Sequence, residues 1–170
     1  QNLVSLVIIS LMGALEKSVA LSLASGLCVL IRTPTRKDGL GLEAFEQKVA
    51  NESPLQGIDK DENPPPLKER RKFLEDRLHD PSALLLVAEH EGEIIGYLES
   101  FPRDRTKMTS HVLHFYLFIM KEFWGKGLGT ALIDIMIEWA KTTSITKISL
   151  NVLSQNKRAI ALYEKLGFLE

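Results

Sequence analysis

Three glycines at alternate positions, Gly125, Gly127 and Gly129, follow an apolar stretch and precede a helical pattern in the segment 115–140. The first turn of a helix leaves backbone N–H groups without partners and carries partial positive charge. Glycines let an anionic group approach that backbone closely, so this segment is suited to bind a phosphate. A turn with a purely structural role is the alternative for the glycines taken alone.

The spacing of these glycines excludes two common nucleotide-binding loops. A Walker-type loop reads G-x-x-x-x-G-K-[ST], whereas here Lys126 precedes Gly127 and neither serine nor threonine follows it. A dinucleotide fingerprint reads G-x-G-x-x-G and has an acidic residue about 20 positions further on. Here the spacing is G-x-G-x-G, and residues 145–153 read ITKISLNVL. The phosphate must therefore belong to another class of ligand.

A second motif near the end of the chain suggests which class. The segment WGKGLG at 124–129 resembles the pyrophosphate motif [QR]-x-x-G-x-[GA] of the GNAT superfamily of acetyl-CoA-dependent N-acetyltransferases, with Trp124 in the Gln/Arg position. The segment LNVLSQNKRAIALYEKLGF at 150–168 resembles that family's N-x-x-[AR]-x-x-x-Y-x-x-x-G-F segment. The resemblance runs from about residue 29 to the end of the chain, and its specific motifs lie in 111–168.

The resemblance implies acetyl-CoA as the cosubstrate, with no metal. The arm of the cofactor is rich in amides and would pair with a strand edge where the sheet splays open. Asn156 would reach the arm or the phosphate end, and it can also cap the last helix. The residues implied to hold the cofactor are, besides Asn156, Leu117, Phe118 and Ile119 on the strand and Trp124, Gly125, Lys126, Gly127, Leu128, Gly129 and Thr130 in the turn.

Acetyl transfer to an amine needs a base for the amine, a donor for the oxyanion and an acid for the leaving thiolate. The resemblance implies Tyr163 as the acid and a backbone N–H of residues 117–119 as the donor. Asn151 stands where related N-terminal acetyltransferases have a glutamate base, and an amide cannot accept the proton. His114, with an ordinary pKa near 6.5, is the first candidate base and Glu99 the second. A structural His114 and a packed core Tyr163 are the alternatives.

Apolar periodicity and turn residues predict the elements that position these groups. We expect strands at 27–32, 83–89, 93–101, 111–119 and 145–153, and helices at 38–50 and 67–78, directly after the glycines and directly after Asn156. This order predicts an α/β sandwich with a mixed sheet. The resemblance implies a GNAT-like three-layer arrangement, in which a mostly antiparallel sheet splays at its central parallel strands and helices cover both faces.

Composition limits the kinds of binding partner and the cellular compartment that we expect for this chain. The chain has 170 residues, of which 45% are apolar and 25% charged, and a net charge of −1 gives no bulk attraction to nucleic acid or to an acidic membrane. The apolar runs before residue 32 are shorter than the roughly 20 residues that a membrane span needs. Cys28 lies in an apolar run, so we expect it to be buried, and a single cysteine fits a reducing compartment. A cytoplasmic protein without nucleic-acid or membrane partners is expected.

The first residues have no counterpart in the family pattern. We divide the chain into an apolar N-terminal extension of uncertain role at 1–26 and an acetyltransferase domain at 27–170. Because the chain begins with Gln1, a fragment or a processed product is expected. Residues 3–9 are β-rich and are expected to form a strand beside 148–152 in the same chain or in the second chain of a homodimer. Loops 51–66 and 102–110 are expected to wall the substrate site.

Two hypotheses of different kinds follow. The first is an enzyme that moves the acetyl group from acetyl-CoA to a primary amine of a small molecule, an amino acid or a peptide N-terminus, by direct attack. The second is a non-catalytic module that binds acyl-CoA and regulates a partner, and its only support is the missing glutamate at position 151.

Overall fold

The computed structural model describes residues 18–53, 55, 65–103 and 109–170. In these residues one sheet has its strands in chain order: β1 (Val19–Ser22), β2 (Cys28–Arg32), β3 (Leu84–His90), β4 (Glu93–Pro102), β5 (Val112–Ile119) and β6 (Lys147–Ser149). Neighbouring strands are antiparallel from β1 to β5, and β5 and β6 are parallel. The prediction of a mixed, mostly antiparallel sheet is confirmed, with the parallel pair at one side of the described sheet.

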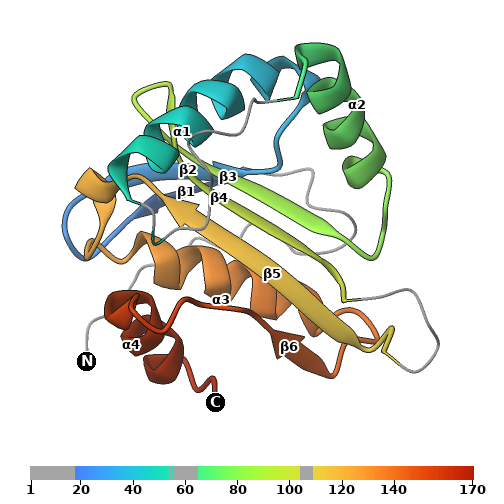
Figure 1. Ribbon diagram of the computed structural model, residues 1–170, viewed down its shortest axis with the longest axis vertical. Coiled ribbons are helices and arrows are strands. Elements are labelled where there is room, and N and C mark those ends of the chain that lie inside the picture. The colour runs from blue at the N-terminus through green and yellow to red at the C-terminus, as the bar shows by residue number, and fades with distance from the viewer. Residues whose placement is uncertain (1–17, 54, 56–64, 104–108) are drawn as a thin grey trace.

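Helices cover both faces of this sheet (Figure 1). In the view of Figure 1, α1 (Gly39–Glu52) and α2 (Leu67–Leu78) lie above the strands, and α3 (Leu128–Ala140) and α4 (Lys157–Lys165) lie below them. Short 3-10 helices precede α1 at Arg36–Asp38 and follow β5 at Lys121–Phe123. The expected three-layer sandwich is therefore present. In the part of the chain that the structure describes, no helix is both long and apolar enough to cross a membrane.

Two expectations about local structure are wrong. The strand expected at 145–153 is limited to β6, because only Lys147, Ile148 and Ser149 have partners on β5. Cys28 is exposed, because it begins β2 on the outward side of an alternating strand whose next residue, Val29, is buried. An apolar run predicts the strand but not which of its residues face the core.

The start of the chain contributes to the sheet. Strand β1 lies within the segment 1–26, and it pairs antiparallel with β2 from Val19 opposite Ile31 to Ser22 opposite Cys28. Residues 3–9, expected to form a further strand, lie outside the described residues, as does most of the loop expected to wall the site at 51–66.

The helices pack on the sheet through periodic apolar faces. The buried residues Leu42, Phe45 and Val49 recur along α1, and Leu128, Leu132 and Met136 recur along α3. Leu128 and Leu132 lie against the strand at Gly96. The core positions α3 so that its first turn lies next to the end of β5.

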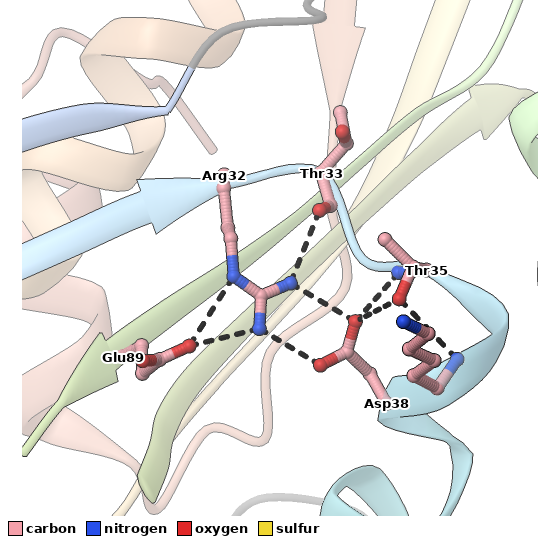
Figure 2. A network of polar contacts seen from close by, with 6 residues as sticks. Arg32, Thr33, Thr35, Asp38 and Glu89 are labelled. Atoms are coloured by element: carbon pink, nitrogen blue, oxygen red, sulfur yellow. Dashed lines mark hydrogen bonds and ion pairs between the residues drawn. The ribbon is translucent and has the colours of Figure 1, made fainter. Parts of the chain in front are cut away.

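A network of charged groups fixes the start of α1 against the sheet (Figure 2). Arg32 on β2 donates from Nη1 and Nη2 to the two oxygens of Asp38, at 2.9 and 2.8 Å, and from Nη2 and Nε to Glu89 on β3, at 2.8 and 3.2 Å. Asp38 Oδ2 also accepts from the backbone N–H of Thr35. Burial acts to raise the pKa of Asp38, but the hydrogen bonds from Arg32 and Thr35 outweigh it and lower that pKa below its ordinary value.

The lowered pKa makes this network a source of pH-dependent stability. The Asp38 contribution is fully present above the unfolded-state pKa of about 3.9 and is lost as the pH falls through the lower folded-state pKa. We expect Asp38→Asn to reduce the free energy of unfolding at pH 7 by about 1–3 kcal/mol, because it removes charge-assisted hydrogen bonds. The difference from wild type shrinks as the pH falls below about 4. Urea unfolding at a series of pH values measures it.

The matched control is Asp76→Asn, at an exposed position of α2. This variant is expected to change the free energy of unfolding by less than about 0.5 kcal/mol. Equal losses for the two variants, or a loss at Asp38 that does not depend on pH, would contradict the role assigned to the network.

Candidate active site

Strands β5 and β6 separate after a short parallel ladder. The ladder pairs Val112 with Lys147, Leu113 with Ile148 and His114 with Ser149, and it ends there. Beyond this point the β5 residues 115–119 pair only with β4, and residues 150–153 leave the sheet. The edge of β5 at Leu117, Phe118 and Ile119, which does not pair with β6, therefore faces the diverging chain, as expected.

A groove of about 850 Å³ occupies this gap. Its walls are the outer edge of β5, the glycine turn with the first turn of α3, residues 151–153 and one face of α4. The groove brings together nearly all the residues expected to hold the cofactor, and the acid candidate: Leu117, Phe118, Ile119, Trp124, Gly125, Gly127, Leu128, Gly129, Thr130, Asn156 and Tyr163. Among the predicted cofactor residues, all of which the structure describes, Lys126 alone is outside this lining.

Glycine is needed at the three positions of the turn for two different physical reasons. Gly125 and Gly127 have φ values of +72° and +92°, which L-residues with a side chain rarely adopt, and a Cβ there would meet no atom within 4 Å. Gly129 lies in α3, where a Cβ would approach Leu162 Cδ2 to 2.9 Å. The first two glycines shape an open concave backbone, and the third permits close packing of α3 against α4.

The amides at the start of α3 point into this concave backbone. The first N–H that bonds back along the chain is that of Ala131, which donates to the carbonyl of Gly127 at 3.1 Å. Helix geometry leaves the preceding amides, those of Leu128, Gly129 and Thr130, without acceptors inside the helix. Together with the helix dipole they favour an anionic group at the end of the groove.

The tryptophan that replaces Gln or Arg in the motif holds the turn. Its indole Nε1 donates to the carbonyl of Ile119, the last residue of β5, at 2.7 Å. The guanidinium of Arg158 lies over the Trp124 ring, 4.5 Å from its centroid, and Arg158 lines the groove. Lys126 instead places its ammonium 5.2 Å from the Phe123 ring, and its carbonyl accepts a hydrogen bond from Ser25 in the β1–β2 turn.

Asn156 connects the start of α4 with Leu55. Its side-chain oxygen accepts from the N–H of Ala159 at 3.1 Å, so it is the N-cap of α4. Its side-chain amide donates to the carbonyl of Leu55 at 3.2 Å, and Leu55 also lines the groove. The expected capping role is present, and the remaining donor group holds a residue that follows α1 against α4.

Tyr163 projects from α4 into the groove and packs against Phe115 and Phe168. Burial raises its pKa to about 12. The phenol therefore keeps its proton throughout the neutral range. A protonated hydroxyl in a largely apolar groove is suited to donate a hydrogen bond or a proton.

His114 lies at the narrow end of the gap, on the last pair of the β5–β6 ladder. Its Nδ1 is 3.3 Å from the hydroxyl of Ser149, and that hydroxyl donates its only proton to the carbonyl of Leu113, also at 3.3 Å. We infer that the hydroxyl is an acceptor toward His114, which would place the imidazole hydrogen on Nδ1 and a lone pair on Nε2. Burial, and then the charge of Arg103, lower the His114 pKa, so the ring is neutral at pH 7.

Glu99 faces the same side of the sheet as His114 but is already engaged. Its carboxylate Oε1 is 3.1 Å from Arg77 Nε on α2, and its Oε2 accepts from the Tyr97 hydroxyl at 3.3 Å. Burial raises the Glu99 pKa, and the charge of Arg77 opposes that shift. Neither His114 nor Glu99 is a lining residue of the groove, but the His114 ring lies 5.2 Å, between centroids, from the ring of Tyr116, which is one.

The comparisons with known proteins bear on this arrangement. Residues 50–168 match the family model described as the acetyltransferase (GNAT) family. The chain belongs to this family. Among its GNAT-like relatives is the 5-NmdU N-acetyltransferase of Pseudomonas phage PaMx11, which is 40% identical over 82 residues, or 48% of this chain and 54% of the phage protein. The chain thus spans about half the length of that relative.

Solved structures agree with the GNAT fold. The GNAT family acetyltransferase of Streptococcus pneumoniae superposes with a TM-score of 0.77 and 31% identity, over 83% of this chain and 84% of that one. The yncA protein of Salmonella typhimurium, solved with its cofactor acetyl-CoA, superposes with a TM-score of 0.71 over 83% of this chain and 79% of that one. At 21% identity, the second likeness concerns the fold alone.

Several groove residues of this GNAT protein were not expected from the sequence. Arg158, Leu55 and Tyr116 line the groove, and Ser149 sets the tautomer of His114. Arg158 lies inside the motif NKRAIALY, so its position on α4 could be predicted from the sequence. Its contact with Trp124 could not. The others depend on contacts between segments far apart in the chain.

The state of His114 can be measured directly. We expect the His114 pKa in the folded protein to lie below the ordinary value of about 6.5. Arg103→Ala removes one of the two causes and should raise that pKa. Two-dimensional NMR of the imidazole nitrogens over a pH series gives both the pKa and the tautomer. A His114 pKa at or above 6.5, or a neutral ring with its hydrogen on Nε2, would contradict this assignment.

Proposed function

We propose that this GNAT protein transfers the acetyl group of acetyl-CoA to a primary amine by direct attack. The observation that carries the proposal is the gap between β5 and β6, which has amides of the α3 N-terminus at one end and Tyr163 in its wall. The acceptor classes that fit are a small amine, an amino acid and a peptide N-terminus. The phage relative bears the name of an N-acetyltransferase, which supports transfer to nitrogen. A cytoplasmic location and a homodimer stay predictions.

The residues of the groove fit the cofactor. The open backbone at Gly125 and Gly127 leaves room for a pyrophosphate, since a Cβ at either position would point into empty space. The α3 amides supply donors for its oxygens without a metal. The edge of β5 that does not pair with β6 passes along the groove at 117–119, and a strand edge is a surface that an amide-rich arm can pair with. Arg158 adds a positive charge beside the glycine turn.

The proposed chemistry includes two proton transfers, one from the amine and one to the leaving sulfur. Acetyl-CoA supplies the acetyl group as a thioester, whose carbonyl carbon bonds to the amine nitrogen as its bond to sulfur breaks. Nε2 of His114 accepts the proton that the amine loses, and the Tyr163 hydroxyl donates one to the leaving sulfur. His114 is preferred to Glu99 as the base because its Nε2 keeps a lone pair, whereas Arg77 and Tyr97 contact both Glu99 oxygens.

The first test removes the acid. Tyr163→Phe keeps the ring packed against Phe115 and Phe168 and deletes only the hydroxyl. We expect kcat to fall by about 10²- to 10⁴-fold, the usual contribution of a general acid, while the Kd for acetyl-CoA stays within about twofold. Thiol release from acetyl-CoA over a panel of amines measures the rate, and calorimetry measures binding. Tight binding without turnover of any amine by the wild-type protein would favour the regulatory acyl-CoA-binding module instead.

The second test separates backbone strain from cofactor binding. Gly127→Ala and Gly92→Ala both force a side chain onto a positive φ, +92° and +82°, in otherwise open space. Each is expected to lower the free energy of unfolding by about 1–2 kcal/mol. Only Gly127→Ala should also weaken acetyl-CoA binding, by about tenfold or more, because Gly92, in the β3–β4 turn, is not among the residues that line the groove. An equal loss of affinity in both variants would remove the glycine turn from the proposed site.

A further inference from the structure

The face of β4 and β5 that carries Glu99 is a row of aromatic rings. In the antiparallel register Phe101 lies opposite His114, Glu99 opposite Tyr116 and Tyr97 opposite Phe118, so all six side chains share one face. The Tyr116 ring is the centre of the row, with centroid distances of 5.2 Å to His114, 5.7 Å to Phe101 and 6.3 Å to Phe118.

Tyr116 is the exposed member of this row. Its exposed fraction is 43%, although it lies in the middle of a strand and follows four buried residues in a run that ends at Phe115. Both Tyr116 and Phe118 line the groove. The row is therefore open where the groove meets the face of the sheet that α1 and α2 cover.

The Tyr116, Phe118 and Tyr97 rings are nearly parallel. The Tyr116 and Phe118 rings are inclined by 25°, and the Phe118 and Tyr97 rings by 11°. A planar ring can stack on the exposed Tyr116 ring, whereas a puckered saturated ring would touch it with fewer atoms. Offset-stacked aromatic pairs are also more favourable than their buried area alone predicts.

The charges beside the row are balanced or positive. Glu99 is paired with Arg77, whose guanidinium also lies 5.0 Å from the centroid of the Phe101 ring. The charge of Arg103 acts on His114 from the loop end of β4. Among the residues named here, no carboxylate is unpaired. None of them could therefore bind a second cationic group on the acceptor. Recognition must then come mainly from the ring faces.

We propose that the acceptor is a primary amine joined by a short arm to a planar aromatic ring, and that Tyr116 stacks on that ring. The inference rests on the acetyltransferase function proposed above. Tyr116 directly precedes the strand edge 117–119 assigned to the cofactor arm and lines the same groove. A short arm between ring and nitrogen would keep the amine beside that edge.

The experiment compares two amines that differ in planarity. Benzylamine and cyclohexylmethylamine have the same carbon count and the same one-carbon arm, and each kcat/KM is expressed per unprotonated amine. The wild-type protein should favour benzylamine by about threefold to tenfold, the size of an aromatic pair interaction. Tyr116→Ala should abolish this preference, and Tyr116→Phe, which keeps the ring, should retain it. Leu40→Ala, which truncates another exposed apolar side chain, on α1, is the control and should retain it too.

Each outcome bears on a different claim. Equal kcat/KM values, or a preference for cyclohexylmethylamine, would overturn the aromatic acceptor. A preference for benzylamine that survives Tyr116→Ala, in a variant that still binds acetyl-CoA, would overturn the role of Tyr116. No thiol release with any amine would remove the proposed function, and with it this inference.

Discussion

The structure depends on where one ladder of backbone hydrogen bonds stops. Strands β5 and β6 are parallel partners for only three residue pairs, and each then follows a different course. If the ladder continued, β6 would cover the outer edge of β5 and close the groove. Its early end leaves a polar strand edge inside an otherwise apolar cleft, which is an unusual surface that an amide-bearing ligand can complete.

The packing around this gap explains why small residues gather there. A Cβ at Gly129 would lie 2.9 Å from Leu162 Cδ2 and 3.4 Å from Ile119 Cδ1. A Cβ at Gly96 would lie 3.3 Å from Leu128 Cδ2. The first turn of α3 is thus in close contact with the sheet on one side and with α4 on the other. These contacts hold the helix amides beside the open edge of β5.

The sequence allowed prediction of features whose causes are local. The glycine turn and the Asn156 cap follow from residue type and spacing, and the sheet and its flanking helices follow from apolar periodicity. Features that depend on partners far along the chain were missed. Ile148, Leu150 and Val152 alternate with polar residues as in a strand, yet only residues with a partner on β5 form one. The exposure of Cys28 and the Arg158–Trp124 contact likewise depend on tertiary neighbours.

The strand order has a consequence for how the protein folds. Because the sheet follows the chain from β1 to β6, the β1–β2, β3–β4 and β4–β5 contacts each join strands that are consecutive in the chain. The β2–β3 contact must close a loop that contains α1 and α2, and the β5–β6 contact must close one that contains α3. Loop closure makes such non-local contacts slow relative to hairpins. The groove is bounded by β5 and by the segment after β6, so it is completed only by the last parallel closure. Acquisition of cofactor affinity during refolding would therefore report a late event, after most of the antiparallel sheet has formed.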